Sequence, residues 1–417
     1  MGYSLLDANT VARMDGQKSA PRDGAMTTIM EEPDLTVRTV RTLEDIEAVA
    51  PDWRALEAAS TDALSYFQTY AWCRSWVAHF AGKSSGRQPI IQTAWRGDTL
   101  VAVWPLMLTG RWGIRKIVAL GDPHSQYCNA ICNPDHGDSD AVRSLLARSL
   151  ETGRCDVALF RPIPESSPLV AALGDVPRIA GYDNESSILD LSAFDSSDAY
   201  VQGLGKLQKR NRNRRRNHLA RLGELSFEVI WPDHKDFAPL VAAGTQMKRR
   251  WLKETGRYST GFAMKGYENF LANLSGDRER LEGACLSVLR AGERVVAVEL
   301  GFIHKRAYYA YIGGFDWELR ELSPGKVQME MTVCWLIDNG VTAYDLLANP
   351  ADYKKSWSNT AIRLLGFAAP LSWKGRLYLN AWLPMLPAAK TVYTAVSARL
   401  RRLVIFGQGV GCLILCM

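Results

Sequence analysis

Two stretches of the chain, IIQTAWRGDTLVAVWPLML at residues 90–108 and CLSVLRAGERVVAVELGFI at residues 285–303, align without a gap at a constant offset of 195 residues. Gly97 falls on Gly292, and residues 101–103 fall on residues 296–298. Each stretch has two runs of β-forming residues around a glycine-containing turn, which is the pattern of a β-hairpin. The sequence therefore predicts an internal repeat that is built around one hairpin in each half.

Each half continues with a helical pattern, a glycine, a short strand and a proline, at AVRSLLARSLETGRCDVALFRPIP (141–164) and VQMEMTVCWLIDNGVTAYDLLANP (327–350). Two copies of a strand–strand–helix–strand unit predict two similar α/β domains in tandem. In each we expect a mixed, mostly antiparallel sheet flanked by helices. We place the domains at residues 35–192 and 193–370, between an irregular leader (1–34) and a tail (371–417), with translation starting at Met1, Met26 or Met30.

Composition indicates a globular protein, because 47% of its 417 residues are apolar and 23% are charged. The net charge is +6, and the segment KLQKRNRNRRRNHLARL (206–222) alone carries eight Lys or Arg and no acid, so the basic character is local. Eight cysteines stand in no C-x-x-C spacing, which favours free thiols and no metal site. Without a secretory signal or a spanning run of about 20 apolar residues, we expect a cytoplasmic protein.

The two halves differ where a helix follows the third β-rich run. In the second half this helix opens with Ser323, Pro324, Gly325 and Lys326. Proline and glycine at a helix start leave N–H groups open to a ligand, and the helix dipole favours an anion there. The first half has NPDHGDSDAVRS (133–144) at the corresponding place, with three acids. Only the second domain is therefore expected to hold a phosphate.

A strand, then a Pro-Gly loop that opens a helix, is similar to the phosphate-binding core of the GNAT acyltransferase superfamily. Three further stretches, FQTYAWCRSW (67–76), the basic segment (206–222) and TAYDLLANPADYKKSWSN (342–359), resemble the CelD-like acetyltransferase family. In that family two GNAT-like domains are joined in tandem, as in FemAB proteins, and the resemblance covers roughly residues 36–370. It implies an acyl-CoA co-substrate whose pyrophosphate lies on the helix start, at Ser323, Pro324, Gly325, Lys326 and Val327, and an amine acceptor that attacks the thioester directly.

Such a transfer needs a base for the amine proton and an acid for the leaving thiolate. Glu299 is our candidate base, because its neighbours in VVAVELGF are apolar and burial would raise its pKa. The alternative is a structural carboxylate that pairs across the sheet. Tyr311 shares a strand face with Tyr309 and is a candidate acid, with core packing as the alternative.

Two other segments carry candidate residues. After the second repeat, Tyr353 is a candidate acid and Lys354 a candidate ligand for phosphate or acceptor; alternatively Tyr353 packs inward and the lysine lies in water. In the loop LGDPHSQYCNAICNPD (120–135), His124 is a second candidate base, since histidine titrates near neutrality. Tyr127 and Asn129 are expected to line an acceptor groove between the domains, although a loop histidine is often merely exposed.

The basic segment is expected to form the first helix of the second domain. Its apolar seam of leucines, at positions 204, 207, 219 and 222, is interrupted by Asn211 and Arg215. We therefore expect Asn211 and Arg215 to face a polar groove, with Arg215 contacting a CoA phosphate and Asn211 the substrate.

The most concrete function is an acyl-CoA-dependent N-acyltransferase acting on a lipid amine, as in bacterial ceramide synthase, or on an amino sugar of a polysaccharide precursor. One alternative is a Fem-like transferase that uses aminoacyl-tRNA. Another is a nucleic-acid-binding protein, but residues 206–222 contain no base-stacking aromatic, so no nucleic acid is expected. The tail (371–417) mixes aromatic, basic and apolar residues, which suits peripheral contact with the inner face of a membrane or simple docking on the domain.

Overall fold

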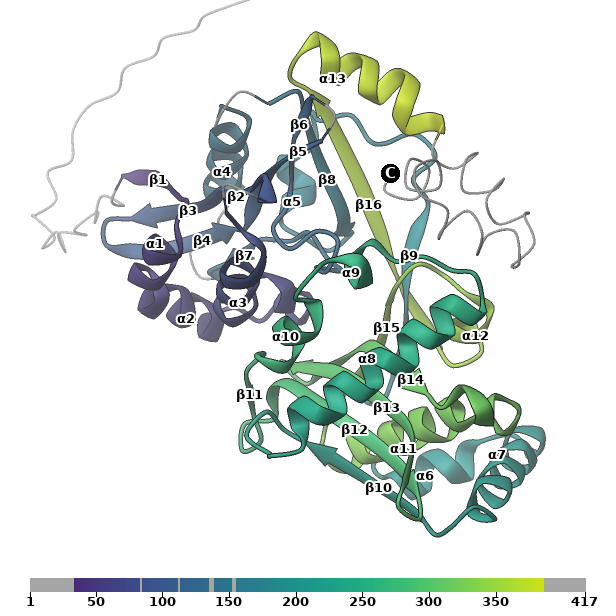
Figure 1. The fold of residues 1–417 in the computed structure, drawn as a ribbon. Coiled ribbons are helices and arrows are strands. Elements are labelled where there is room, and N and C mark those ends of the chain that lie inside the picture. Colours follow the sequence, from purple (N-terminus) through teal and green to yellow (C-terminus); the bar gives the residue numbers. More distant parts are fainter. Residues whose placement is uncertain (1–33, 83–84, 112, 135–138, 152–154, 386–417) are drawn as a thin grey trace, which may run out of the picture. The chain divides into compact units, whose positions relative to one another are not determined.

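The computed structural model describes residues 34–82, 85–111, 113–134, 139–151 and 155–385 (Figure 1). The expected leader, apart from Asp34, and the tail beyond residue 385 lie outside this range. The first half of the chain contains β1 (Leu35–Val40), α1 (Leu43–Ala48), α2 (Ala50–Ala59), η1 (Ala63–Gln68), α3 (Tyr70–Phe80), β2 (Arg87–Pro89), β3 (Ile91–Arg96), β4 (Thr99–Trp104), β5 (Leu106–Arg111), β6 (Ile114–Ala119), β7 (Ile131–Cys132), α4 (Ser139–Glu151), β8 (Val157–Pro164), α5 (Leu169–Ala172) and β9 (Asn184–Asp190).

The second half contains α6 (Ser197–Gly203), α7 (Lys206–Ala220), β10 (Leu225–Ile230), α8 (Phe237–Glu254), α9 (Thr260–Ala263), α10 (Tyr267–Ala272), β11 (Gly276–Asp277), β12 (Glu282–Ala291), β13 (Arg294–His304), β14 (Ala307–Phe315), η4 (Trp317–Leu322), α11 (Pro324–Asp338), β15 (Ala343–Ala348), α12 (Asp352–Lys355), β16 (Thr360–Pro370), α13 (Trp373–Leu377) and the π-helix η5 (Tyr378–Trp382).

The internal repeat expected from the sequence is present. The hairpins β3–β4 and β12–β13 turn at Gly97 and Gly292, whose φ angles of 57° and 58° favour glycine. In each copy a third strand follows, then a helix, then a strand that pairs parallel to the third, giving β6–α4–β8 and β14–α11–β15. The copies differ at Pro105, which separates β4 from β5, whereas Leu300 at the equivalent position lies inside the uninterrupted β13.

The last strand of each repeat completes the sheet of the other repeat. The described strands form two sheets, and the longer one has the order β10-β12-β13-β14-β15-β9-β16-β8-β6-β5-β2. In this sheet β9 of the first half lies between β15 and β16 of the second half. In return, β16 of the second half pairs with β8 of the first (Figure 1). The expected boundary at residues 192 and 193 follows the sequence repeat, but the strands on either side of it are exchanged.

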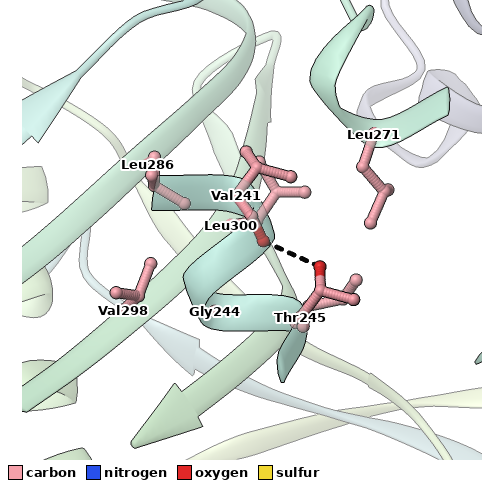
Figure 2. Close-up of a pocket in the computed structure, with 8 residues that line it drawn as sticks. Val241, Gly244, Thr245, Leu271, Leu286, Val298 and Leu300 are labelled. Atoms are coloured by element: carbon pink, nitrogen blue, oxygen red, sulfur yellow. Dashed lines mark hydrogen bonds between the residues drawn. The ribbon is translucent and has the colours of Figure 1, made fainter. Parts of the chain in front are cut away.

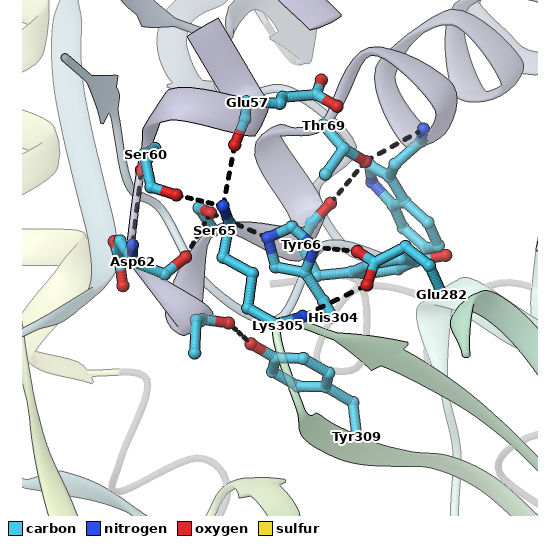
Figure 3. A network of polar contacts seen from close by, with 12 residues as sticks. Glu57, Ser60, Asp62, Ser65, Tyr66, Thr69, Glu282, His304, Lys305 and Tyr309 are labelled. Atoms are coloured by element: carbon cyan, nitrogen blue, oxygen red, sulfur yellow. Dashed lines mark hydrogen bonds and ion pairs between the residues drawn. The ribbon is translucent and has the colours of Figure 1, made fainter. Parts of the chain in front are cut away.

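The two halves also share a core. The Tyr66 ring stacks on Phe302, with 4.4 Å between the ring centroids, inside one cluster of buried residues drawn from both halves. Polar contacts border this core (Figure 3): Nζ of Lys305 donates to the carbonyl oxygen of Glu57 at 2.7 Å, and His304 Nε2 lies 3.1 Å from Ser65 Oγ. We conclude that the halves fold as one cooperative unit.

Different helices cover the two faces of the second-half sheet. On one face, α8 lies over Val298, Leu300 and Ile312, and the cavity left there is only about 10 Å³ (Figure 2). A space of that size holds about one water molecule, so it is no acyl-chain site. On the other face, α11 packs on Tyr308 and its neighbours. Successive side chains of a strand point to opposite faces, so Glu299 faces α11 while Val298 faces α8.

The close approach of α8 to β14 depends on glycine at position 314. A Cβ added there would lie 2.5 Å from the Gly244 carbonyl oxygen. Gly314→Ala is therefore expected to lower the free energy of unfolding by about 1–3 kcal/mol, measured by urea denaturation. Gly313→Ala is the matched control, because its nearest neighbour would be Glu299 Oε2 at 3.8 Å. Equal losses in the two variants would contradict this packing.

Candidate active site

The site begins where β14 and β15 separate. Their parallel ladder covers three residue pairs and ends at Tyr309 and Asp345, although β14 runs on to Phe315. β14 also carries a bulge opposite the Leu300–Gly301 step of β13, which increases local twist. Gly313, past the bulge, is exposed to solvent. Beyond this pair, residues 310–315 of β14 continue without pairing to β15, and we call the place where the two strands part the gap.

Glu299 lies beside this gap, paired across the ladder with Gly313. Its carboxylate is 4% exposed and accepts hydrogen bonds of 3.0 Å from the hydroxyls of Tyr308 and Tyr344. Burial raises the pKa of Glu299 to about 7, although the two tyrosine hydrogen bonds lower it. A carboxyl with this pKa can accept a proton near neutral pH. The first repeat has Trp104 at the equivalent position and so lacks the carboxylate.

Tyr353 and Lys354 follow β15 on the short helix α12. Burial, and after it the negative charge of Glu299, raises the pKa of Tyr353, and 51% of Tyr353 is exposed. Lys354 is buried, and its Nζ donates to the carbonyl oxygens of Leu347 and Ala348 at 2.9 and 2.8 Å. The structure therefore shows the opposite of the alternative in which Tyr353 packs inward and Lys354 lies in water.

The start of α11 has the features expected of a phosphate site. Ser323 precedes it in the left-handed conformation, with φ of 56°, and Pro324 is its first residue. The first-turn N–H groups of a helix generally lack partners four residues earlier, and no acidic residue lies in this turn. Here Pro324 has no N–H, and the Lys326 N–H donates to the Ser323 carbonyl oxygen at 3.0 Å, so the N–H groups of Gly325 and Val327 are the ones that this turn offers to an anion. Lys326 is exposed, while Val327 is buried. The equivalent helix α4 has Asp140 in its first turn, which disfavours an anion.

Comparison with known proteins agrees with this geometry. Residues 206–355 match the model of the acetyltransferase (GNAT) domain family. These residues form a GNAT acyltransferase domain. The expected resemblance to the CelD-like family of this superfamily is thereby confirmed. No curated protein matches the chain.

Two solved structures with TM-scores above 0.5 support the fold around the GNAT domain. FemX matches with a TM-score of 0.54 and 11% identity, over 82% of this chain and 98% of FemX. The C-terminal domain of a protein assigned as a lysylphosphatidylglycerol synthetase from Agrobacterium fabrum matches with a TM-score of 0.51 and 13% identity, over 82% and 97%. A tandem GNAT protein from the clavulanic acid biosynthesis pathway aligns at 0.44 and 13%, over 81% and 99%. The predicted α/β class with two GNAT-like domains is confirmed.

His124 and Tyr311 meet at the junction of the two halves, on the face of the GNAT sheet that lies away from Glu299. His124 is 2% exposed; its Nδ1 accepts from Trp76 Nε1 at 3.0 Å, so its Nε2 donates to the Gly261 carbonyl at 3.2 Å. Tyr311 donates its hydroxyl to the His124 carbonyl at 3.0 Å. Both ring nitrogens of His124 are thus occupied by protein groups, which argues against its role as a base.

Burial lowers the pKa of His124 to about 4. The folded state therefore binds this proton less readily than the unfolded chain, whose histidines titrate near pH 6.5. The contribution of neutral His124 to the free energy of unfolding is therefore complete above pH 6.5 and is lost as the pH falls towards 4. We expect the protonation of this residue to lower the free energy of unfolding by roughly 3 kcal/mol over that range. Urea denaturation at pH 7 and pH 4.5 checks this value. A His124→Gln variant that loses as much stability as the wild type over this range would contradict the assignment.

Tyr127 and Asn129 lie inside the protein instead of lining an open groove. The Tyr127 hydroxyl donates to Asp345 Oδ2 at 2.6 Å, and Asn129 Nδ2 donates to Asp62 Oδ2 at 2.6 Å. Both residues are 1% exposed. Burial raises the pKa of Asp345, which also accepts from Ser186 Oγ. The sequence analysis missed Asp345, although an isolated acid in the apolar run AYDLLA signals a buried polar contact.

Helix α7 packs through only part of the expected face. Leu219 of the predicted seam is fully buried, as expected, but Leu207 and Leu222 are 69% and 47% exposed, so the expectation was wrong for these two residues. Instead Arg212 and Arg216 form ion pairs with Glu330 of α11. Glu330 is 6% exposed, and a buried carboxylate requires a partner charge, which rotates α7 towards these arginines. Asn211 and Arg215 are partly buried beside this contact.

Among the described residues, no group of His, Cys, Asp or Glu side chains is arranged to hold a metal ion. In the same part of the chain, no helix is long and apolar enough to cross a bilayer.

Proposed function

We propose that the protein is an acyl-CoA-dependent N-acyltransferase that transfers the acyl group directly to an amine. The observation that carries this proposal is the position of Glu299. Its carboxylate has a pKa of about 7 and lies at the gap between β14 and β15. The gap leads along β14 towards the start of α11, where first-turn N–H groups suit the pyrophosphate of a coenzyme A thioester.

In this proposal Ser323, Pro324, Gly325, Lys326 and Val327 hold the pyrophosphate, and the thioester lies along the free side of β14. Glu299 removes a proton from the acceptor ammonium, and the amine nitrogen attacks the thioester carbonyl carbon. The C–N bond forms and the C–S bond breaks. The thiolate takes a proton from a tyrosine, and that tyrosine recovers a proton from the nitrogen as the amide forms. Tyr353 is our candidate for this role, because the charge of Glu299 contributes to its raised pKa, whereas Tyr311 is bonded to His124 on the other face.

A Fem-like transfer from aminoacyl-tRNA is the second candidate, favoured by the structural likeness to FemX. That likeness shows the fold alone. Within residues 206–355 as described, the longest helix is α8, with 18 residues, so no extended arm is present there. Nucleic-acid binding through α7 is disfavoured because Arg212 and Arg216 are engaged by Glu330.

The acceptor we expected, a lipid amine or an amino sugar, remains a proposal. A lipid acceptor would be favoured by membrane contact, and the tail presents exposed apolar side chains at Trp373 and Leu377. Vesicle flotation with anionic lipid should retain the wild type, and Trp373→Ala with Leu377→Ala should weaken retention. Equal flotation of both proteins would remove this basis for a lipid acceptor.

A panel of acyl-CoAs of increasing chain length tests the donor. Binding to the folded state alone raises stability, by about 2.7 kcal/mol at a ligand concentration of 100 Kd. At least one acyl-CoA should therefore raise the melting temperature, and the chain length with the largest effect identifies the donor class. Stabilisation by aminoacyl-tRNA and by no acyl-CoA would replace the proposal with the Fem-like alternative.

A further inference from the structure

A cluster of cationic side chains lies towards the C-terminal end of α8. It begins at Lys248, which directly follows Met247, and the Met247 Cβ lies 3.1 Å from the position that a Cβ on Gly314 of β14 would take. Nζ of Lys248 is 4.1 Å from the centroid of the Trp251 ring, and Cζ of Arg257 is 4.9 Å from the same ring. One indole therefore positions two cations near each other. Cation–π contacts of this kind hold the charged groups without neutralising them.

These cations repel one another. Burial first, and then the charge of Arg257, lowers the pKa of Lys248 to about 8. Burial likewise lowers the pKa of Lys354 to about 8, and the charge of Lys248 lowers it further. The charge of Asp345 acts in the opposite direction and raises the pKa of Lys354. An anion bound here would relieve this repulsion.

Neighbouring residues of α8 are neutralised in a different way. Arg249 is 3.0 Å from Glu268, and Arg250 is 3.6 Å from Glu318. Across the residues that the structure describes, no carboxylate forms an ion pair with Lys248 or Arg257. The two arginines that follow Lys248 are thus paired with acids, whereas Lys248 and Arg257 contact the Trp251 ring and keep their charge available to a ligand.

The cluster lies on the α8 face of the sheet, beside β14. Burial first, and then the charge of Glu299, raises the pKa of Tyr353, whereas the charge of Arg257 lowers it. α8 and α11 cover opposite faces of the sheet. An anion at Lys248 is therefore a different group from the pyrophosphate at the start of α11.

We propose that Lys248 and Arg257 bind an acidic group of the acceptor, so that the acceptor is an amine that also carries a carboxylate or a phosphate. This inference rests on the proposed N-acyl transfer. It narrows the acceptor class: a neutral long-chain amine lacks the group that these cations would bind, whereas an amino acid, an amino phosphate or a lipid built from one provides it.

The test uses the full chain, acyl-CoA and matched acceptors: ω-amino acids and aminoalkyl phosphates with two to four carbons, each compared with the amino alcohol of equal length. The readout is the ratio of kcat/KM for the acidic acceptor to kcat/KM for the alcohol. We expect a ratio of at least tenfold in the wild type, a ratio near one in Lys248→Met, and partial recovery in Lys248→Arg. Arg249→Gln is the control and should keep both the activity and the ratio. The better of the two acid series identifies the acidic group.

Equal activity on acids and alcohols would overturn the inference and leave the proposed transfer intact. The inference would also be overturned if Lys248→Met raised the KM for acyl-CoA and left the acid-to-alcohol ratio of kcat/KM unchanged. The cations would then bind the donor. Binding of an aminoalkyl phosphate is measured separately by calorimetry. If no acceptor is acylated but this binding weakens at least tenfold in Lys248→Met, the anion site stands and the proposed transfer fails. If neither acylation nor Lys248-dependent binding is found, both fail.

Discussion

Replacing Glu299 with Gln is expected to lower kcat by about 10²- to 10⁴-fold, the range that a positioned general base contributes. Gln keeps the size of the side chain and can still accept from Tyr308 and Tyr344, so the fold and acyl-CoA binding should change little. Steady-state kinetics together with acyl-CoA calorimetry check this result. Glu228→Gln, at an exposed carboxylate on β10 of the same sheet, is the control and should keep full activity.

The pH dependence of kcat provides an independent readout of the same residue. Glu299 acts as a base only when ionised, and burial raises its pKa to about 7. The rate should therefore fall tenfold per pH unit well below pH 7. Tyr344→Phe removes a hydrogen bond that lowers this pKa, so the acidic limb should move to higher pH. An acidic limb that does not move, together with an active Glu299→Gln variant, would show that another group accepts the proton.

Separating the halves at the sequence boundary is expected to abolish folding. Residues 193–417 expressed alone would lack β9, which pairs Leu189 with Tyr344 of β15 and Ile188 with Thr360 of β16. They would also expose Phe302, which is fully buried against Tyr66. Removal of several large buried contacts exceeds the 5–15 kcal/mol by which a typical domain is stable. Size-exclusion chromatography and urea denaturation should show aggregated or non-cooperative material.

Coexpression of residues 34–192 with residues 193–417 is the control, and it should restore a folded complex through the exchanged strands. A fragment that starts at residue 183 separates the two causes, because it regains β9 but still lacks the shared core. We expect this fragment to remain unstable. A monomeric 193–417 fragment that unfolds cooperatively and binds acyl-CoA would show that the halves are independent domains.

The repeat and its hairpins were predictable because their pattern is local. The alternation of β-forming residues and the glycines at positions 97 and 292 specify strands and turns without reference to distant contacts. The exchange of β9 and β16 was not predictable in this way. Each strand comes last in its own repeat. The alternation of buried and exposed residues along a strand does not specify which neighbouring strand it pairs with.

Within the site, the sequence predicted Glu299 and the start of α11, because each has a local signal: an acid among apolar residues, and Pro-Gly at a helix start. The inward position of Lys354 depends on the carbonyl groups of Leu347 and Ala348, which turn towards it where Leu347 adopts a positive φ of 64°. The face of α7 depends on Glu330, more than 100 residues away. The first feature depends on the conformation of a nearby turn and the second on a contact between distant residues, and helix periodicity contains neither.

The central claim is that the start of α11 and the free side of β14 hold the acyl-CoA. Amide hydrogen exchange, followed with and without saturating acyl-CoA, tests it most directly. We predict increased protection of the amides at residues 323, 325–327 and 311–315, with no change at the start of α4, where Asp140 disfavours a phosphate. Binding that leaves both α11 and β14 unprotected, or that protects the start of α4 instead, would contradict the account.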